Sequence, residues 1–114
     1  MASPPAGAVV LVRFPFSDLT RSKLRPAVVL ADSGLGDTIL CQVTSNPYAD
    51  QRSIELTDVD FEQGSLQRTS YVRPGKLFTA SESLIVREVG TLSFEAHQKI
   101  VESVIELLRS GLSE

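Results

Sequence analysis

The sequence contains few of the residues on which several common kinds of protein depend. It has one cysteine, one histidine and no tryptophan among 114 residues. One cysteine excludes an intramolecular disulfide framework and a cysteine-rich zinc cluster. No apolar run is long enough for a membrane span, and the opening MASPPAGA lacks the basic and apolar regions of a signal peptide. We therefore expect a cytoplasmic protein that does not contact a membrane.

Familiar catalytic motifs are absent too. The chain has no phosphate-cradling loop, no G-x-S-x-G sequence and no dinucleotide fingerprint. His97 has no second histidine for a relay, and we expect it on a helix surface or at the edge of the core. Cys41 falls on an apolar strand face, which predicts a buried, inert thiol. We interpret Asp58, Asp60 and Glu62 as a solvated turn, since no histidine or glycine-punctuated ion loop accompanies them. We expect no metal and no cofactor.

Positive charge is scarce overall but locally concentrated. The net charge is −3, and the sequence pI is about 5.1. Residues 1–80 hold eight basic and eight acidic residues, whereas residues 81–114 hold three basic and six acidic ones. From Arg13 to Arg25, four basic residues accompany Asp18 alone. The acidic balance argues against a long-duplex binder, while the local basic segment is suited to a short RNA.

What the chain does contain indicates one small domain. We expect a flexible lead over residues 1–6, a single domain over 7–110 and a tail over 111–114. Apolar residues at helical spacing after Ser93 predict an amphipathic helix that ends before Gly111. The expected strands, with a helical turn at Val59–Gly64, are Ala8–Phe14, Pro26–Ala31, Thr38–Ser45, Ser53–Leu56, Thr69–Arg73, Lys76–Thr79 and Leu84–Val89. The pattern favours a mainly β (α+β) fold, a small antiparallel barrel capped by a helix.

Two apolar runs flank the turn-forming residues Ala31–Asp37, which predicts a β-hairpin. If the turn is centred between Gly34 and Leu35, the numbers of cross-strand partners sum to 69. Arg25 then lies opposite Thr44, and directly opposed Cβ atoms are about 5 Å apart. A bulge or another turn centre would shift this register. One face of the hairpin is wholly apolar and is expected to be core.

Several segments of this chain occur in an order that resembles a known family. An opening strand GAVVLVRFPF precedes a basic loop, RPAVVL, a glycine-containing turn and a strand ending in Thr-Ser. SYVRP, KLFT and VGTLS follow before the helix. The ordered set resembles the PemK/MazF family of bacterial toxin endoribonucleases over roughly residues 7–109. The resemblance implies an SH3-like barrel that pairs as a homodimer. Such pairing would explain why Val29 and Leu40 fall on an otherwise polar hairpin face.

The resemblance also implies an activity, that of a metal-independent endoribonuclease (mRNA interferase) acting on single-stranded RNA. In the family, the Arg before Pro and the Thr at the end of the third strand form the catalytic pair, and Arg25 and Thr44 fill these positions. The ribose 2′-hydroxyl attacks the adjacent phosphate to give a 2′,3′-cyclic phosphate and a 5′-hydroxyl. A cognate antitoxin neutralises the toxin, and its often acidic C-terminal tail occupies the RNA groove.

Elementary chemistry constrains the roles of these residues. A guanidinium stays protonated, so we assign Arg25 to the charge on the non-bridging phosphate oxygens. Thr44 donates to a phosphate oxygen or orients the 2′-hydroxyl. A base tuned to neutral pH is missing, and Asp18 is the candidate. Tyr71 offers a stacking face for an unpaired base. The residues expected to contact RNA are Ser17, Asp18, Thr20, Arg21, Lys23, Gln42, Ser45, Ser70, Tyr71 and Arg73.

One departure from the family pattern keeps alternatives open. Family members commonly have an acidic residue after the first-strand glycine, whereas Ala8 follows Gly7 here. The departure leaves the level of activity open and supports a second hypothesis, a barrel that binds RNA without cleaving it. A third hypothesis is a gyrase-directed poison on a related fold. We rank it last, because the tail at residues 109–114 shows no aromatic or apolar anchor.

Overall fold

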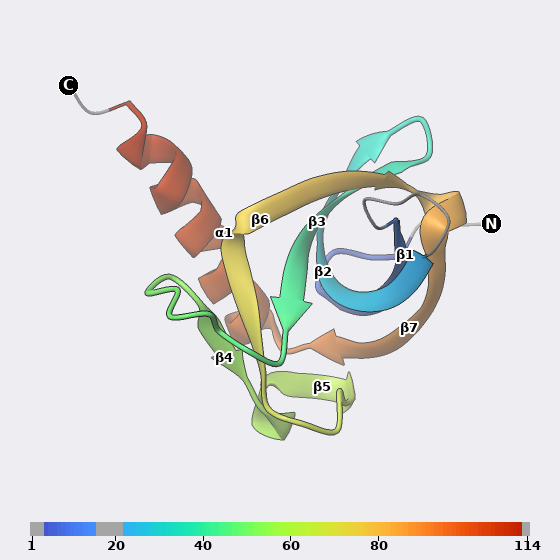
Figure 1. The fold of residues 1–114 in the computed structure, drawn as a ribbon, viewed down its shortest axis with the longest axis horizontal. Coiled ribbons are helices and arrows are strands. Elements are labelled where there is room, and N and C mark those ends of the chain that lie inside the picture. Colours follow the sequence, from blue (N-terminus) through green and yellow to red (C-terminus); the bar gives the residue numbers. More distant parts are fainter. Residues whose placement is uncertain (1–3, 16–21, 113–114) are drawn as a thin grey trace.

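The computed structural model describes residues 4–15 and 22–112, which form a curled antiparallel sheet with one long helix against it (Figure 1). The strand order is β4-β6-β3-β2-β1-β7-β5. The elements are β1 (Ala8–Pro15), β2 (Ser22–Gly34), β3 (Asp37–Thr44), β4 (Ile54–Leu56), η1 (Asp58–Asp60), β5 (Phe61–Gly64), β6 (Ser70–Ser81), η2 (Glu82–Leu84), β7 (Ile85–Leu92) and α1 (Phe94–Ser110). The mainly β prediction is confirmed, and the sheet forms a seven-stranded half-barrel. Within the described ranges, no helix is long and apolar enough to cross a membrane.

The β2–β3 hairpin has the predicted register in its central part. Ala27 pairs with Gln42, so the numbers sum to 69 as expected. At the turn, however, Gly34 pairs with Asp37, which centres the turn one residue later than predicted. Gly36 has a φ of +82°, a conformation that glycine adopts without steric cost. Two register shifts along β2 absorb the difference, and the pairs from Ala27 to Val29 keep the predicted alignment.

Both faces of this sheet are buried, and each has its own core. Alternate side chains along a strand point to opposite faces, so β1, β2 and β3 contribute to both cores. The first core includes residues of α1 and consists of Val9, Val28, Cys41, Val43, Leu56, Val72, Leu92, Ala96 and Ile100. The second core has no residue from the helix and consists of Ala8, Val10, Val12, Ala27, Val29, Leu40 and Ala80.

The second core corrects one sequence-based interpretation. Val29 and Leu40 were expected on a polar face that a second copy of the chain would cover. Instead they are 1% and 0% exposed within a single chain, packed with Val10 and Ala27. Curling of the sheet buries them, because strands distant in sequence close over that face (Figure 1). These two residues therefore give no support to a homodimer.

The β6 and β7 strands are longer than predicted. Pro74 and Gly75 were expected to separate two strands, yet β6 continues through them. The pairing with β3 shifts register here, from Cys41 with Leu77 to Val43 with Val72, and the intervening residues bulge out. A proline is tolerated at such a bulge because no ladder hydrogen bond is lost there.

Gly90 was expected to end the last strand, but β7 runs through it to Leu92. A Cβ atom at Gly90 would lie 2.7 Å from the Phe61 ring, so the close approach of β5 requires glycine. This glycine marks tight packing rather than a strand end.

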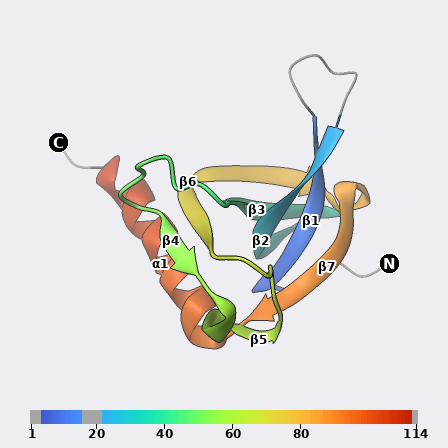
Figure 2. The ribbon, with the colours of Figure 1, turned by 60° about the horizontal axis from the view of Figure 1, so that its bottom comes forward.

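The C-terminal helix begins and ends where the sequence predicts. Ser93 is the N-cap, and its Oγ accepts a hydrogen bond from the backbone N–H of Ala96 at 3.2 Å. Ile100 and Val104 are buried against the sheet, and burial of each side chain contributes about 1.5–3 kcal/mol. Figure 2 shows α1 along one side of the sheet, next to β4 and β6.

The predicted helical turn at Val59–Gly64 is half correct. Asp58–Asp60 form a single 3-10 turn, and Phe61–Gly64 then form strand β5. The carboxylates make local hydrogen bonds. Asp60 Oδ2 accepts from the backbone N–H of Thr57 at 2.8 Å, and Asp58 Oδ1 accepts from Ser65 Oγ at 2.6 Å. These contacts give the two aspartates a structural role in the turn.

Candidate functional site

A pocket of about 250 Å³ lies at the open end of the β2–β3 hairpin. It is lined by Leu24, Arg25, Pro26, Val43, Thr44, Ser45, Leu66, Arg68 and Ser70. The lining residues include two arginines and no carboxylate, so the pocket has the electrostatic character of an anion site.

Hairpin register explains why Arg25 and Thr44 line the same pocket. Ala27 pairs with Gln42, and the same register continued by two residues places Arg25 opposite Thr44. Arg25 also pairs with Val12 of β1, so its backbone is fixed within the sheet. Both side chains are half-buried. The structure therefore brings together the two residues that the sequence singled out.

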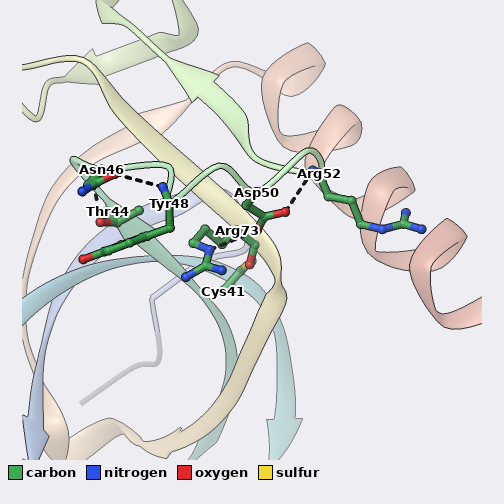
Figure 3. Close-up of polar contacts among 7 residues, drawn as sticks. All are labelled: Cys41, Thr44, Asn46, Tyr48, Asp50, Arg52 and Arg73. Atoms are coloured by element: carbon green, nitrogen blue, oxygen red, sulfur yellow. Dashed lines mark hydrogen bonds and ion pairs between the residues drawn. The ribbon is translucent and has the colours of Figure 1, made fainter.

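The hydrogen bonding of Thr44 fixes how its hydroxyl is used. Thr44 Oγ1 accepts a hydrogen bond from the backbone N–H of Asn46 at 3.1 Å (Figure 3). A hydroxyl has one proton to donate, and this contact does not use it. Thr44 therefore keeps its hydroxyl proton for a further hydrogen bond.

Arg68 is the pocket residue that the sequence analysis missed. It lies on the loop between β5 and β6, and it is exposed. Gln67 has a φ of +64°, and its N–H donates to Ser65 Oγ at 2.8 Å, while Ser70 Oγ donates to the Arg68 carbonyl at 3.3 Å. These bonds order the loop. The only signal in the sequence was an arginine two residues before SYVRP, in a polar stretch.

Apart from Arg73, the other predicted contact residues divide into four groups. Ser45 and Ser70 line the pocket directly. Tyr71 pairs with Thr44 across the β3–β6 ladder and is half-buried, while Gln42 lies two residues further along β3. Lys23 is exposed on β2, two residues from Arg25. The remaining four, Ser17, Asp18, Thr20 and Arg21, lie outside the described residues.

Arg73 does not line this pocket. Its Nε lies 3.0 Å from Asp50 Oδ2, and its guanidinium lies 5.3 Å from the centroid of the Tyr48 ring (Figure 3). The hydrogen bond from Arg73 lowers the pKa of the Asp50 carboxyl, and the backbone N–H of Arg52 adds to this effect. Arg73 and Asp50 contribute instead to a second hollow of about 830 Å³ beside α1, which Lys99 also lines.

Cys41 and His97 occupy positions that agree with the sequence analysis. Cys41 is fully buried, and burial raises the pKa of its thiol to about 12. The S–H donates to the Arg73 carbonyl at 3.0 Å. His97 is half-buried at the edge of the core, where its ring packs over Gly7, and burial lowers its pKa. A neutral thiol in the core is inert as a nucleophile.

The chain is a small half-barrel with a pocket whose lining includes two arginines and the hydroxyl groups of Thr44, Ser45 and Ser70. Residues 6–108 match the family described as PemK-like, MazF-like toxins of type II toxin–antitoxin systems, and the chain belongs to this family. A search of curated proteins by sequence gave no significant match.

Solved structures with the same fold agree with this family assignment. MazF in the MazE–MazF complex (Form-III) from Deinococcus radiodurans has a TM-score of 0.74 and 19% identity, covering 92% of this chain and 95% of that one. An endoribonuclease in complex with its cognate antitoxin, from a mycobacterial species, has a TM-score of 0.70 and 16% identity, covering 95% of both chains. The Mycobacterium tuberculosis toxin MazF-mt6 has a TM-score of 0.69 and 15% identity, covering 90% of this chain and 96% of that one.

Proposed function

We propose that this protein is the toxin of a type II toxin–antitoxin pair and that it is a metal-independent endoribonuclease of single-stranded RNA. One observation carries the proposal: Arg25 and Thr44 line one pocket, whose other lining residues include a second arginine and no carboxylate. An RNA phosphate is an anion that a guanidinium and a hydroxyl donor can bind together. Family membership supports the same activity.

In the proposed reaction the ribose 2′-oxygen attacks the adjacent phosphorus. A P–O2′ bond forms and the P–O5′ bond breaks, which leaves a 2′,3′-cyclic phosphate and a 5′-hydroxyl. The 2′-hydroxyl proton passes to a base, for which Asp18 remains the predicted group. The departing 5′-oxygen takes up a proton from water, and the base returns its proton to the solvent. Negative charge on the non-bridging oxygens increases as the pentavalent phosphorus forms, and stabilising that charge is the main task of the site.

Arg25 and Thr44 are arranged for this task. The Arg25 guanidinium presents parallel N–H groups to two oxygens of one phosphate. In the proposed reaction Thr44 donates its hydroxyl proton to a phosphate oxygen, and the hydrogen bond from Asn46 leaves that proton available. Neither group is a strong base, so we expect slow turnover compared with nucleases that use a tuned histidine.

The proposal includes two protein partners. MazE accompanies MazF in the Deinococcus structure, and a cognate antitoxin accompanies the mycobacterial endoribonuclease. By analogy we propose a cognate antitoxin whose acidic tail neutralises the arginines of the pocket. We also propose a homodimer. Ile105 and Leu108, 44% and 62% exposed on α1, supply apolar surface for such a contact.

End-group analysis of RNA tests the proposal. Purified protein is incubated with single-stranded RNA in EDTA, and the products are treated with phosphatase and kinase to identify their ends. We expect 5′-hydroxyl and cyclic phosphate ends, and loss of roughly 100-fold or more in rate for Arg25→Ala.

The control for this experiment is Arg109→Ala, which removes an exposed arginine from the last turn of α1. It should cleave as the native protein does. Undiminished cleavage by Arg25→Ala, or dependence of cleavage on added metal, would contradict the proposal. RNA binding without any cleaved ends would favour the non-catalytic barrel.

A further inference from the structure

We infer that Tyr48 forms a stacking platform for an unpaired RNA base next to the Arg25–Thr44 pocket. The inference rests on the proposed function, because it assigns a further contact to the same substrate. It concerns a residue outside the pocket lining, on the loop between β3 and β4.

The exposure of Tyr48 is the first observation. Its side chain is 62% exposed, although an aromatic ring gains free energy by burial. Phe94 is the other strongly exposed aromatic among the described residues, at 71%, and it lies at the start of α1. Tyr48 instead follows Thr44 by four residues, directly after the strand that carries the hydroxyl of the site.

The ring is supported from one side by a fixed cation. The Arg73 guanidinium lies over the Tyr48 ring, 5.3 Å from its centroid. Asp50 holds that guanidinium through a 3.0 Å ion pair, and the Arg73 and Asp50 side chains are each 20% exposed. Figure 3 shows the three side chains in order: the Tyr48 ring, the Arg73 guanidinium and the Asp50 carboxylate. The Arg73 guanidinium thus makes a cation–π contact with the ring, and the 62% exposure of Tyr48 leaves ring surface for a ligand.

The backbone of the loop is held in a costly conformation. Tyr48 and Ala49 have φ values of +54° and +58°, which residues with a Cβ rarely adopt. Glycine or asparagine would adopt this conformation at lower cost. The surrounding hydrogen bonds maintain it: the Tyr48 N–H donates to Asn46 Oδ1 at 2.9 Å, and the Asp50 N–H donates to the Pro47 carbonyl at 2.9 Å.

The same hydrogen bonds connect the platform to the site. Asn46 donates its N–H to Thr44 Oγ1 and accepts from the Tyr48 N–H through its side chain (Figure 3). Thr44 and Tyr48 therefore form one ordered unit. The proposed substrate is single-stranded RNA, and its unpaired bases are commonly bound by stacking on aromatic rings.

Tyrosine fluorescence measures this contact without requiring cleavage. The chain has no tryptophan and two tyrosines, so in a Tyr71→Phe background all the emission comes from Tyr48. The probe is a random-sequence pool of 2′-O-methyl octaribonucleotides, which lack the attacking hydroxyl. Binding of the probe should quench the emission. In anisotropy titrations with the same labelled pool, Tyr48→Ala should weaken binding by roughly 5- to 150-fold.

Two variants show whether the loss of base stacking causes the weaker RNA binding expected for Tyr48→Ala. Tyr48→Phe retains the ring and should bind within about threefold of the native protein, since stacking requires no hydroxyl. Phe94→Ala, the matched removal of an exposed aromatic on another element, should have no effect. Equal affinities for Tyr48→Ala and Phe94→Ala would overturn the inference, as would saturation of binding without quenching.

The experiments can contradict the stacking role of Tyr48 and the proposed nuclease function independently of each other. If the native protein produces no cleaved ends but the probe quenches Tyr48, the nuclease fails and the platform stands. If the native protein cleaves RNA and Tyr48→Ala does so with unchanged KM and kcat, the platform fails and the nuclease stands. A Tyr48→Ala effect limited to affinity for a protein partner would also overturn it.

Discussion

The backbone N–H of Asn46 donates a hydrogen bond to Thr44 Oγ1 at 3.1 Å. This bond occurs at the end of β3, where the chain leaves the sheet. It uses an acceptor position of the hydroxyl and leaves the proton for a ligand. Because Arg25 lines the same pocket, we propose that the Thr44 hydroxyl and the Arg25 guanidinium donate to the same ligand.

The contribution of the Thr44 hydroxyl to cleavage should therefore be measurable separately from that of its methyl group. Thr44→Val keeps the shape but removes the donor, and we expect a loss of roughly 100-fold in kcat on single-stranded RNA. Thr44→Ser keeps the donor and should stay within about tenfold of the native rate. Single-turnover cleavage of labelled RNA measures both. Equal rates for the valine and serine variants would show that the hydroxyl takes no part.

Arg68 should act on RNA affinity more than on the chemical step. It lies on a loop at the pocket rim and is exposed, whereas Arg25 is half-buried on a strand. We expect Arg68→Ala to raise KM several-fold with little change in kcat. If Arg68 binds one phosphate, the slope of log affinity against log salt should decrease by about 0.7. Arg109→Ala, which removes an exposed arginine at the end of α1, is the control. A decrease in kcat with constant KM would contradict this role.

His97 should make stability depend on pH in a defined window. Burial lowers the pKa of His97 in the folded protein, and its Nδ1 atom is buried without a partner among the described residues. The unfolded chain takes up a proton near pH 6.5, while the folded protein resists it, so stability falls as pH decreases from about 6.5 toward the folded pKa. Below the folded pKa the loss is complete.

Two measurements check the His97 prediction. Because the chain has one histidine, its NMR titration gives the folded pKa directly. The Tm of His97→Leu should vary less with pH between about 7 and 5 than that of the native protein. A folded pKa at or above the unperturbed value would refute the prediction.

The central hairpin is the part of the site that could be predicted best. Alternation of apolar and polar residues sets which side chains oppose each other, so Arg25 and Thr44 could be paired before the fold was known. The turn centre was wrong by one residue, because bulges have no clear sequence signal. This error does not affect the predicted position of the site, since the register shifts lie between the turn and the pocket.

Arg68 and Tyr48 could not be predicted from their neighbours in sequence. Arg68 reaches the pocket because the loop between β5 and β6 folds back toward β2 and β3. We infer a stacking role for Tyr48 because the guanidinium of Arg73, 25 residues later in the chain, packs against its ring. Arg73 itself was predicted to contact RNA. Its ion pair with Asp50 gives it a supporting role in the structure, and direct RNA contact by Arg73 remains only a prediction.

By itself, the sequence determined the elements with strong local patterns: the register of the central part of the hairpin, and a helix capped by Ser93. Only the tertiary structure decided that Val29 and Leu40 are buried within one chain and that a second arginine lines the pocket. The physical reason is that periodicity is a property of neighbouring residues, whereas the closing of a curled sheet depends on contacts between strands distant in sequence.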